Sequence, residues 1–365
     1  MKCKDLPDRY ARQVALPEIG ANGQKRLAEG RVLVIGAGGL GAPALLYLAA
    51  AGVGMVGIVD DDRVDTGNLQ RQVLYESDDV GRPKTEAAAE RLGALNPDVR
   101  VRHHATRVDA GNALELMSGY DVVIDATDRL EGKFLINDAA AKAGKPLVYA
   151  SALGFEAQVA VFDAKRGPCL RCLFPEPPDV PALTCAEAGI LGAVTGMAGS
   201  AQALEAIKLV LAADDSQSPF QPLLGRLWLL DARSFRTRTV SLPRDPECAV
   251  CRQPSEAIPL ISAAPREIAA AELGEHPEAL LIDVREDEEW ASGHLPGAVH
   301  LPLSRLMETV PDLPRRETYI AYCAHGIRSQ AAAQLLAEAG YRPVFSLRGG
   351  IAGITDRALE RPARA

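Results

Sequence analysis

Cysteine is the residue type whose spacing in this chain points most directly to chemistry. The 365-residue sequence contains seven cysteines, and four of them form two Cys-x-x-Cys pairs. The pairs are Cys169/Cys172 and Cys248/Cys251, and the remaining cysteines are Cys3, Cys185 and Cys323. In a reducing cytosol, this spacing favours metal ligands and reactive thiols over a disulfide scaffold.

Cys323 lies where an apolar run, residues 319–322, gives way to a helix-like segment that begins at Ser329. A cysteine at such a turn faces backbone N–H groups and the positive end of the helix dipole, which favour the thiolate, and Arg328 adds a cation. The loop between Cys323 and Arg328 is one residue shorter than the similar phosphate-binding loop of cysteine phosphatases. It therefore predicts a sulfur-transfer site with Cys323 as the nucleophile. A buried cysteine next to a surface arginine is the alternative.

The two Cys-x-x-Cys pairs supply the right number of thiolates for a tetrahedral zinc site. An all-sulfur shell leaves no open position for catalysis, so the site would be structural and would tie a loop to the end of its domain. Two redox-active dithiols, or two unrelated pairs, are the alternatives. We predict Zn²⁺ held by Cys169, Cys172, Cys248 and Cys251.

A glycine-rich turn with the pattern Gly-x-Gly-x-x-Gly, residues 36–41, predicts a nucleotide site. It follows an apolar strand, 31–35, and precedes a helix-like run. Its glycines let the backbone approach phosphates at the helix N-terminus, and Asp60, at the end of the next strand, can accept hydrogen bonds from a ribose. Taken alone, this pattern indicates an NAD site.

Charged residues after successive strands favour adenylation over hydride transfer. Arg71 and Lys84 follow the acidic run 60–62, and Asp128 follows the strand that begins at Asp121. Arginine and lysine would stabilise charge on the α-phosphate and on the departing pyrophosphate, and an aspartate facing the same site can hold Mg²⁺. Because α/β proteins bind ligands where their strands end, we expect these residues to form one site.

The elements that must position these residues predict an α/β protein, with a Rossmann-like nucleotide-binding domain and a smaller α/β domain. Near-continuous apolar strands alternate with helices, which predicts a mainly parallel sheet covered on both faces. The predicted strands are 31–35, 53–59, 99–105, 121–126, 146–152, 158–162, 227–231 and 236–242, and the predicted helices include 42–51, 110–117 and 196–212. A proline-rich loop, 174–181, leads to Cys185.

The second domain follows a predicted linker. We predict domains at 1–253 and 266–365, joined by 254–265. In the second domain we expect strands at 279–284, 319–322 and 344–347 and a helix at 329–339.

Composition excludes several classes of protein. The chain is 47% hydrophobic and 24% charged, with a formal net charge of −8, which does not favour a nucleic-acid partner. No apolar run has the length of a membrane-spanning helix, and the N-terminus lacks the apolar core of a signal peptide. We expect a cytoplasmic protein.

Residues 9–252 resemble the bacterial E1-like activating enzymes, the family of the molybdopterin-synthase and thiamine-pathway adenylyltransferases. The resemblance covers about two thirds of the chain and rests on ordered motifs. These are Arg9-Tyr10-x-Arg12-Gln13, the glycine turn 36–41, Asn68-Leu69-Gln70-Arg71-Gln72, Gly81-x-Pro83-Lys84, Thr127-Asp128 and Leu183-Thr184-Cys185-x-Glu187-Ala188-Gly189.

The resemblance implies ATP as substrate and assigns roles to single residues. It implies that Asp60 holds the ribose, that Asn68, Arg71 and Lys84 contact phosphates, and that Asp128 binds Mg²⁺. The implied nucleotide site comprises Gly36, Gly38, Gly39, Gly41, Asp60, Asp62, Gly67, Asn68, Leu69, Gln70, Arg71, Lys84, Asp128 and Arg129. Arg129 is a departure, because the family usually has Asn there; the departure affects a contact next to Asp128 and not Asp128 itself.

Three further implications concern residues outside that list. Arg12 resembles the family arginine that reaches into the partner subunit's site, which implies a homodimer. The family places zinc at the four paired cysteines. In some members a cysteine at the position of Cys185 forms a thioester or an acyl disulfide with the activated carrier, and in others it is dispensable; a buried structural cysteine is the alternative.

Residues 266–355 resemble a single-domain rhodanese. The matches are Leu281-Ile282-Asp283-Val284-Arg285, Glu289-Trp290-x-x-Gly293-His294-Leu295-Pro296-Gly297-Ala298, the Cys323 loop and Leu347-Arg348-Gly349-Gly350-Ile351. We expect Asp283 and Arg285 to form an internal ion pair and His294 to be structural. Ile354 stands where the family often has Trp.

Together the two resemblances imply two steps on one substrate. The first domain would adenylate the C-terminal carboxylate of a ubiquitin-like sulfur carrier protein ending in Gly-Gly, and a Cys323 persulfide would then attack it. Cys185 is a candidate second thiol for release of the thiocarboxylate, and a cysteine desulfurase or thiosulfate would supply the sulfur. The rivals are an NAD-dependent oxidoreductase and a scaffold with a non-catalytic rhodanese docking module.

Overall fold

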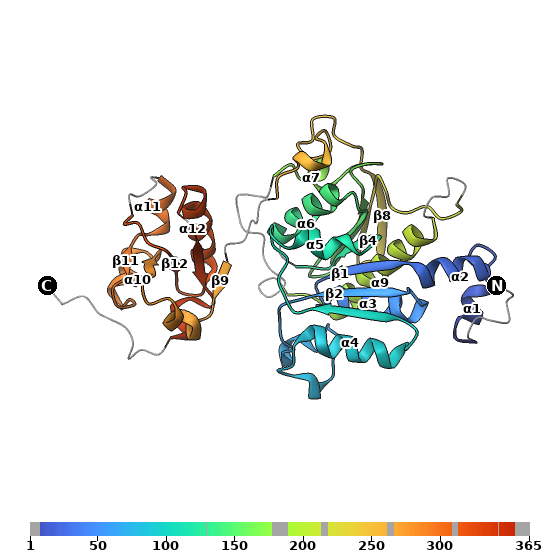
Figure 1. Ribbon diagram of the computed structural model, residues 1–365, viewed down its shortest axis with the longest axis horizontal. Coiled ribbons are helices and arrows are strands. Elements are labelled where there is room, and N and C mark those ends of the chain that lie inside the picture. Colours follow the sequence, from blue (N-terminus) through green and yellow to red (C-terminus); the bar gives the residue numbers. More distant parts are fainter. Residues whose placement is uncertain are drawn as a thin grey trace. The chain divides into compact units, whose positions relative to one another are not determined.

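The computed structural model describes residues 8–128, 130–176, 189–212, 218–260, 266–308, 313–341 and 343–354. They fall into two compact units, Met1–Ile261 and Ser262–Ala365 (Figure 1). Part of the predicted linker, 254–260, packs on the first unit: Ile258 is buried, and Lys142 Nζ donates to the carbonyls of Glu256 and Ile258, each at 2.7 Å.

The first unit is built on one eight-stranded sheet with the order β3-β2-β1-β4-β5-β6-β7-β8. Its strands are β1 Arg31–Ile35, β2 Met55–Val59, β3 Arg100–His104, β4 Val122–Asp125, β5 Leu147–Leu153, β6 Glu156–Phe162, β7 Arg226–Asp231 and β8 Arg236–Ser241. The strands from β3 to β5 are parallel. From β5 onward the pairing is antiparallel, because a tight turn at Gly154, with φ +59°, folds β6 back on β5. The predicted mainly parallel sheet is confirmed.

Helices cover both faces of this sheet (Figure 1). They are α1 Ala11–Val14, α2 Gly20–Glu29, α3 Gly41–Ala51, α4 Lys84–Leu95, α5 Ala113–Ser118, α6 Leu130–Ala143, α7 Leu170–Leu173 and α9 Gly192–Leu211, with 3-10 turns η2 Asp8–Tyr10, η3 Thr66–Asn68, η4 Ser77–Asp79 and η5 Ser255–Ala257. Alternate side chains of β1 enter different cores: Val32 and Val34 pack with α3, α4 and α9, while Leu33 and Ile35 pack with α5 and α6. This two-sided burial explains why the strand is apolar throughout.

The strand order reverses next to β1, which pairs with β2 on one side and with β4 on the other. The carboxyl ends of these three strands lie at one edge of the sheet, called here the carboxyl edge, and a crevice outside such a reversal is where α/β proteins bind ligands. Helix α9 runs between the two edges: at its start Gly192 approaches the backbone of Gln70, and near its end Val210 packs on Gly30.

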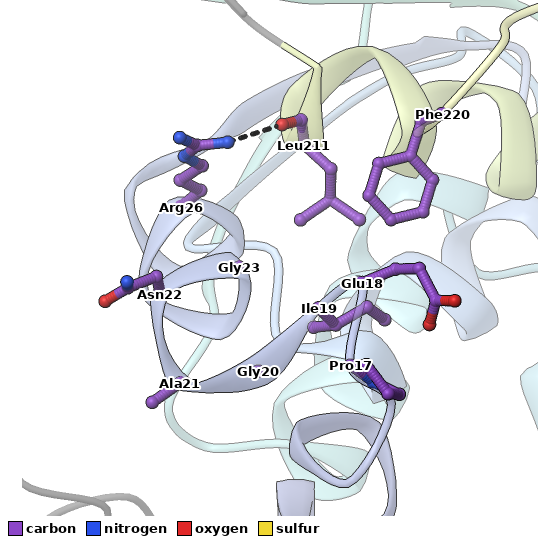
Figure 2. Close-up of a pocket in the computed structure, with 10 residues that line it drawn as sticks. All are labelled: Pro17, Glu18, Ile19, Gly20, Ala21, Asn22, Gly23, Arg26, Leu211 and Phe220. Carbon is purple, nitrogen blue, oxygen red and sulfur yellow. Dashed lines mark hydrogen bonds between the residues drawn. The ribbon is translucent and has the colours of Figure 1, made fainter. Parts of the chain in front are cut away.

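A pocket of about 330 Å³ lies at the opposite edge (Figure 2). Its lining residues come from the start of α2 and from the end of α9, where Arg26 Nη1 donates to the Leu211 carbonyl at 2.9 Å. Since α2 leads directly into the first residue of β1, this pocket is separate from the carboxyl edge.

The second unit is a five-stranded, fully parallel sheet with the order β11-β10-β12-β13-β9. Its elements are β9 Arg266–Ile268, η6 Ala270–Glu275, β10 Leu280–Asp283, α10 Asp287–Ala291, β11 Val299–His300, α11 Leu303–Glu308, β12 Tyr319–Tyr322, α12 Ile327–Glu338, β13 Val344–Leu347 and η7 Gly350–Gly353. On β12, Tyr319 and Ala321 enter one core and Ile320 and Tyr322 the other. None of the helices in the described parts of the chain is long and apolar enough to cross a membrane.

Candidate functional site

The glycine turn joins β1 to α3 with a backbone path that other residues could not follow. Gly36 has φ +95°, and a Cβ there would lie 2.8 Å from the Ala126 carbonyl oxygen after β4. A Cβ on Gly41 would overlap the Gly36 carbonyl itself. The turn therefore stays narrow, with backbone N–H groups available at the start of α3 for an anion.

Asp60 is bonded to this turn. Its Oδ2 accepts from the Ala37 N–H at 2.7 Å and its Oδ1 from the Asp62 N–H at 2.8 Å. Burial raises the pKa of Asp60, and Lys84 opposes the shift. On the other side of the turn, the Tyr75 hydroxyl donates to the Ala37 carbonyl at 2.8 Å. The carboxylate predicted to hold a ribose thus also fixes the turn that would hold phosphates.

Lys84 is the first residue of α4 and is brought to the same edge by a short antiparallel contact between Arg63 and Pro83. Its side chain is only 5% exposed, and its Nζ lies 2.8 Å from Asp62 Oδ2. Because Asp62 is 67% exposed, this pair is weak enough for a stronger anion to displace the carboxylate. Lys84 and Asp62 therefore lie in the expected site, paired with each other.

The segment 66–72 lies beside the glycine turn. Asp65 caps it by accepting from the Gly67 N–H at 2.7 Å, and Arg71 Nη1 donates to the Gly67 carbonyl at 3.0 Å. A Cβ on Gly38 would lie 3.6 Å from Gln72 Nε2. Leu69 packs against the core and anchors the segment. Its polar neighbours Asn68 and Gln70 lie outside that core, on the side of the carboxyl edge.

Asp128 is exposed in the bend after β4, and a buried carboxylate holds that bend. Asp125 Oδ1 accepts from the Thr127 N–H at 3.0 Å and from the Thr127 hydroxyl at 2.6 Å. Lys133 Nζ lies 3.3 Å from the same oxygen, and Gln202 Nε2 donates to the Asp125 carbonyl at 2.7 Å. Arg129 falls outside the described residues.

Lys133 and Gln202 were not predicted from the sequence. Lys133 lies in α6 and Gln202 in α9, and each helix carries several other polar residues, so nothing in the sequence pattern distinguished these two. Asp125 lies within the predicted strand 121–126, and no role was predicted for it.

The structure thus brings three of the predicted groups to neighbouring strand ends: the glycine turn after β1, Asp60 after β2 and Asp128 after β4. Arg12 is elsewhere. It is exposed on α1, next to Tyr10, whose ring faces Gly52 just beyond the end of α3. Helix α3 has 11 residues and begins at the glycine turn. Roughly 16 Å of helix therefore separates that turn from the end of α3, near which Tyr10 and Arg12 lie.

The four paired cysteines converge although 79 residues separate the members of each contact. Cys169 Sγ lies 3.6 Å from Cys248 Sγ, and Cys172 Sγ lies 3.6 Å from Cys251 Sγ. All four sulfurs lie within 4.8 Å of one another. A tetrahedron with Zn–S bonds of about 2.3 Å requires sulfur separations of roughly 3.8 Å, so the four thiols fit a zinc ion.

Close packing and burial of the thiols disfavour their ionised form at this place. Contact with the Cys251 thiol, and then burial, raise the pKa of Cys169. Thiols packed this closely resist ionisation unless a metal compensates their charge. The turn that carries Cys169 and Cys172 is fixed by Arg171, whose Nε and Nη2 donate to the buried Asp138 at 2.8–3.1 Å.

In the second unit, Cys323 directly follows β12 and is 1% exposed. Its Sγ accepts from the Gly326 N–H at 3.1 Å and lies 3.7 Å from Ser329 Oγ. Gly326 has φ +92°, and a Cβ on Gly350 would overlap the Cys323 carbonyl, so two glycines shape the loop. Within the described residues, the sulfur therefore accepts one backbone hydrogen bond from the loop, whereas several backbone N–H groups were expected.

Arg328 has a partner that was not predicted. Its Nη1 and Nη2 donate to Glu289 Oε2 and Oε1 at 2.7 and 2.6 Å. This contact lowers the pKa of Glu289 to about 2. Glu289 belongs to the motif that resembles rhodanese. It precedes Arg328 by 39 positions in the sequence, and only the fold brings the two side chains together.

The structure describes the contacts of Asp283, Arg285 and His294, for which structural roles were expected. Asp283 and Arg285 form the predicted internal ion pair, with Arg285 Nη2 2.6 Å from Asp283 Oδ2 and also donating to the Gly293 carbonyl. This prediction is confirmed. His294 stacks on Trp290 with ring centroids 3.6 Å apart, a packing contact in keeping with a structural residue.

Two family models match the chain. The model of the ThiF family matches residues 10–250, which is more than half of the sequence, and that of the rhodanese-like domain matches residues 267–357. The chain belongs to the ThiF family. As a ThiF-family protein it carries the rhodanese-like domain as its second unit, so the predicted family and the predicted pairing are confirmed.

Relatives of this ThiF-family chain include proteins with both domains. "Probable adenylyltransferase/sulfurtransferase MoeZ" of Mycobacterium tuberculosis is 42% identical over 366 residues, covering 94% of this chain and 91% of the relative. "Adenylyltransferase and sulfurtransferase MOCS3" of Arabidopsis thaliana is 35% identical over 387 residues, covering 94% and 82%. "Sulfur carrier protein adenylyltransferase" of Thermus thermophilus is 48% identical over 254 residues, covering 68% and 92%.

Solved structures agree on the fold of the first unit. A crystal structure of E. coli MccB with ATP has a TM-score of 0.57 at 23% identity and covers 67% of this chain and 75% of that one. At this identity the likeness shows the fold alone. The NAD-dependent oxidoreductase that the glycine turn alone would indicate is not supported by the ThiF-family relatives, which are named for adenylyl and sulfur transfer.

Cys185, the candidate second thiol, lies outside the described residues, as does Cys3.

Proposed function

We propose that this protein adenylates the C-terminal carboxylate of a small sulfur carrier protein with ATP and then converts the activated carboxylate to a thiocarboxylate. The observation that carries the proposal is the joining of two sites in one ThiF-family chain: a phosphate-binding turn with cations at one sheet edge, and a cradled Cys323. Relatives that span both domains carry the names of both activities.

In the adenylation step, the carboxylate oxygen of the carrier attacks the α-phosphorus of ATP, and pyrophosphate leaves with the bonding electrons. The backbone of the glycine turn and Asp60 would bind the nucleotide, while Lys84 and Arg71 would stabilise the charge that develops on the phosphates. Asp62, Gly67, Asn68 and Gln70 would also contact the nucleotide, and Leu69 would hold their segment against the core. The AMP group makes the carboxyl carbon electrophilic.

Asp128 is the proposed ligand of Mg²⁺. Magnesium is commonly bound by one or two carboxylates together with substrate phosphates, and an exposed carboxylate at the carboxyl edge fits that donor set. When bound, the ion would neutralise phosphate charge. The task of Asp125, with Thr127 and Lys133, is to hold the bend that presents Asp128.

In the sulfur-transfer step, the terminal sulfur of a Cys323 persulfide attacks the adenylated carbon, AMP leaves, and an acyl disulfide links the carrier to Cys323. A thiolate then attacks the Cys323 sulfur, releases the thiocarboxylate and leaves a disulfide that a reducing thiol must cleave. Cys185 is the candidate thiol within the chain. The Gly326 N–H would stabilise the negative sulfur of Cys323.

The proposed partners are a ubiquitin-like sulfur carrier protein that ends in Gly-Gly, a sulfur donor such as a cysteine desulfurase or thiosulfate, and a second copy of this chain. A homodimer is supported by the position of Arg12, because the length of α3 separates it from the glycine turn of its own chain. Arg12 would then serve the site of the partner. We place the reaction in the cytoplasm.

We also propose a structural Zn²⁺ at Cys169, Cys172, Cys248 and Cys251, supported by the 3.6 Å sulfur contacts. Once bound, it would contribute folding stability to the first unit and take no part in the reaction.

The adenylation proposal is tested by carrier-dependent exchange of labelled pyrophosphate into ATP. We expect exchange only when a carrier is present, and a loss of at least about 100-fold in Lys84→Ala, the scale on which a charge-stabilising donor acts. The absence of exchange with every candidate carrier would overturn adenylation.

The sulfur-transfer proposal is tested by intact mass after treatment with a sulfur donor. Wild type should gain one sulfur on Cys323 and Cys323→Ala should gain none. An identical adduct on both proteins would instead favour the scaffold with a non-catalytic rhodanese-like module.

A further inference from the structure

The edge strand β3 presents arginines that have no acidic partner. Among the described strands it pairs with β2 alone, so one of its two sides is open. Arg100, Arg102 and His103 are exposed along it. Neither arginine forms an ion pair or a side-chain hydrogen bond with the residues that the structure describes. By contrast, Arg82 and Arg91, which belong to the segment before β3, are paired with carboxylates.

The stretch that contains β3 is basic in a chain that is acidic as a whole. Residues 100–108 include three arginines, two histidines and no carboxylate, although the formal net charge of the chain is −8. Neighbouring groups respond to this charge: burial, and then charge on His103 and Arg102, lower the pKa of His104. Arg107 is compensated, because a carboxylate after β2 lies 3.8 Å from it. The other two arginines keep their charge open to solvent.

The side chains of β3 alternate between the two faces of the sheet. Val101 packs against the core on the face that α4 covers, so Arg100 and Arg102 lie on the opposite face. Glu115 of α5 acts electrostatically on His104, which is consistent with His104 lying on that opposite face as well. The strand therefore has an apolar side chain on one face and its open cations on the other.

The pairing with β2 defines the backbone groups on the open side. The N–H of Arg100 donates to a carbonyl before β2 at 3.0 Å, and the carbonyl of His104 accepts from an N–H after β2 at 3.2 Å. In a parallel pair every second residue bonds to the neighbouring strand, so Val101 and His103 direct their N–H and C=O groups away from β2. The register runs without a bulge over all five residues. The open side is thus a regular row of donors and acceptors to which a further strand can pair.

The arginines decide which strand can pair there. Like charge prevents two copies of the same edge from pairing, but it attracts a strand of opposite charge. The other edge strand, β8, differs: its Arg236 lies opposite Asp231, whose pKa is lowered by a hydrogen bond from Ser234 and further by Arg236. One of the arginines on β8 is therefore compensated, whereas both on β3 are open.

We propose that β3 is a docking edge for an extended acidic segment of a partner protein, which adds to the sheet as a further strand. Backbone hydrogen bonds with Val101 and His103 give affinity, and alternate side chains give specificity. Residues of the added strand beside Arg100 and Arg102 share their face and are glutamate or aspartate, spaced about 7 Å apart at every second position. The residue between them lies beside Val101 and is apolar. This docking is independent of the proposed adenylation and sulfur transfer.

The test measures binding of a capped, fluorescein-labelled peptide of three Glu-Val repeats to the full-length protein by fluorescence anisotropy. A peptide with three glutamates followed by three valines tests the alternation, and a labelled oligouridine tests nucleic acid. We expect saturable binding of the alternating peptide below about 1 mM and weaker binding of the other two. Hydrogen exchange of the segment 99–105 locates the site, because the amides of Val101 and His103 should become protected when the peptide binds.

Arg100→Gln combined with Arg102→Gln removes both open charges and leaves the backbone of the strand intact. Two exposed ion pairs contribute modestly, so we expect the Kd of the alternating peptide to rise about 3–30-fold. Arg236→Gln combined with Arg238→Gln is the matched control, since it makes the same change in net charge on the exposed strand β8. The control should change the Kd by less than about twofold. Equal losses in the two double variants would indicate attraction to the whole protein and contradict a site at β3.

A second pair of variants tests the backbone contact. The N–H of His103 points away from β2, so His103→Pro removes an outward donor without removing a hydrogen bond of the sheet, and proline is tolerated at such edge positions. His103→Val removes the imidazole and keeps the donor. We expect the Kd of the peptide to be at least about threefold higher for His103→Pro than for His103→Val, the effect of losing one hydrogen bond.

The Tm of each variant verifies that the first unit is folded, and the exposed arginine pair keeps the test decisive even where proline disturbs the strand. The proposal is refuted if the alternating peptide does not bind, or if the peptide with blocked order binds equally well. Equal affinity of His103→Pro and His103→Val would also refute the addition of a strand. Tighter binding of oligouridine, with displacement of the peptide, would assign the edge to a nucleic acid instead.

Discussion

Removing the ammonium group of Lys133 tests the buried network behind the nucleotide edge. Lys133 Nζ lies 3.3 Å from Asp125 Oδ1 and donates to the Ala150 carbonyl at 2.8 Å, while the two charged side chains are 2% and 0% exposed. Methionine has a similar volume and no charge. Lys133→Met therefore leaves the Asp125 carboxylate buried without its cation.

The magnitude follows from that burial. Breaking a buried ion pair by removing one partner costs about 3–5 kcal/mol. In a unit of this size each 1 kcal/mol lowers the Tm by about 2–4 °C, so we expect the first unit to melt roughly 6–20 °C lower. The chain has two tryptophans, Trp228 in β7 and Trp290 in α10, so fluorescence together with calorimetry assigns each transition to its unit.

A double variant separates stability from function. Asp125→Leu combined with Lys133→Met removes both charges and should recover most of the lost Tm, because apolar replacement of a buried pair is often neutral. Pyrophosphate exchange should stay low, since Thr127 loses the carboxylate that fixes the Asp128 bend. The reasoning is wrong if Lys133→Met melts within about 2 °C of wild type, an effect below roughly 1 kcal/mol.

Three further predictions concern the other parts of the molecule. Gly41→Ala should lower pyrophosphate exchange at least about tenfold, because its Cβ would overlap the Gly36 carbonyl and a distorted turn misplaces the phosphates. Gly93→Ala, where the added Cβ meets open space within α4, should retain wild-type exchange and Tm or gain slightly; equal exchange in both variants would contradict the assignment of the turn. Cys248→Ser should lower bound zinc, measured by atomic emission, together with the Tm of the first unit, while Cys323→Ser should keep its zinc; metal-free wild type with an unchanged Tm would argue against a structural ion. Finally, the pKa of Glu289 falls from 4.5 to about 2 in the folded protein, so its stabilising contribution is full above 4.5 and is lost as the pH falls toward 2. Over that range the Tm of the second unit should decline less steeply in Glu289→Gln than in wild type, and parallel curves would exclude the pair as a source of the pH dependence.

The sequence pattern predicted the fold best where a strand is buried on both faces, because only an apolar central strand fits there. The run 31–35 could only be a central strand, because every residue after its first is buried against helices on one face or the other. The turn that follows was predictable for a steric reason, since only glycine fits against the Ala126 carbonyl and the Gly36 carbonyl. The expected stretch 146–152 was also a strand, but the antiparallel pairing that begins there depends on the turn at Gly154 and was not predicted.

The sequence by itself determined which atoms could react: the thiol of Cys323, four paired thiols, and cations spaced after a glycine turn. Spacing carries that information because strand-to-helix turns and Cys-x-x-Cys pairs are local. Only the tertiary structure decided which charges meet. The fold pairs Asp125 with Lys133, Lys84 with Asp62, and Arg328 with Glu289, which is 39 positions away in the sequence. Electrostatic partners are set by distance in space, and distance in the chain does not encode it.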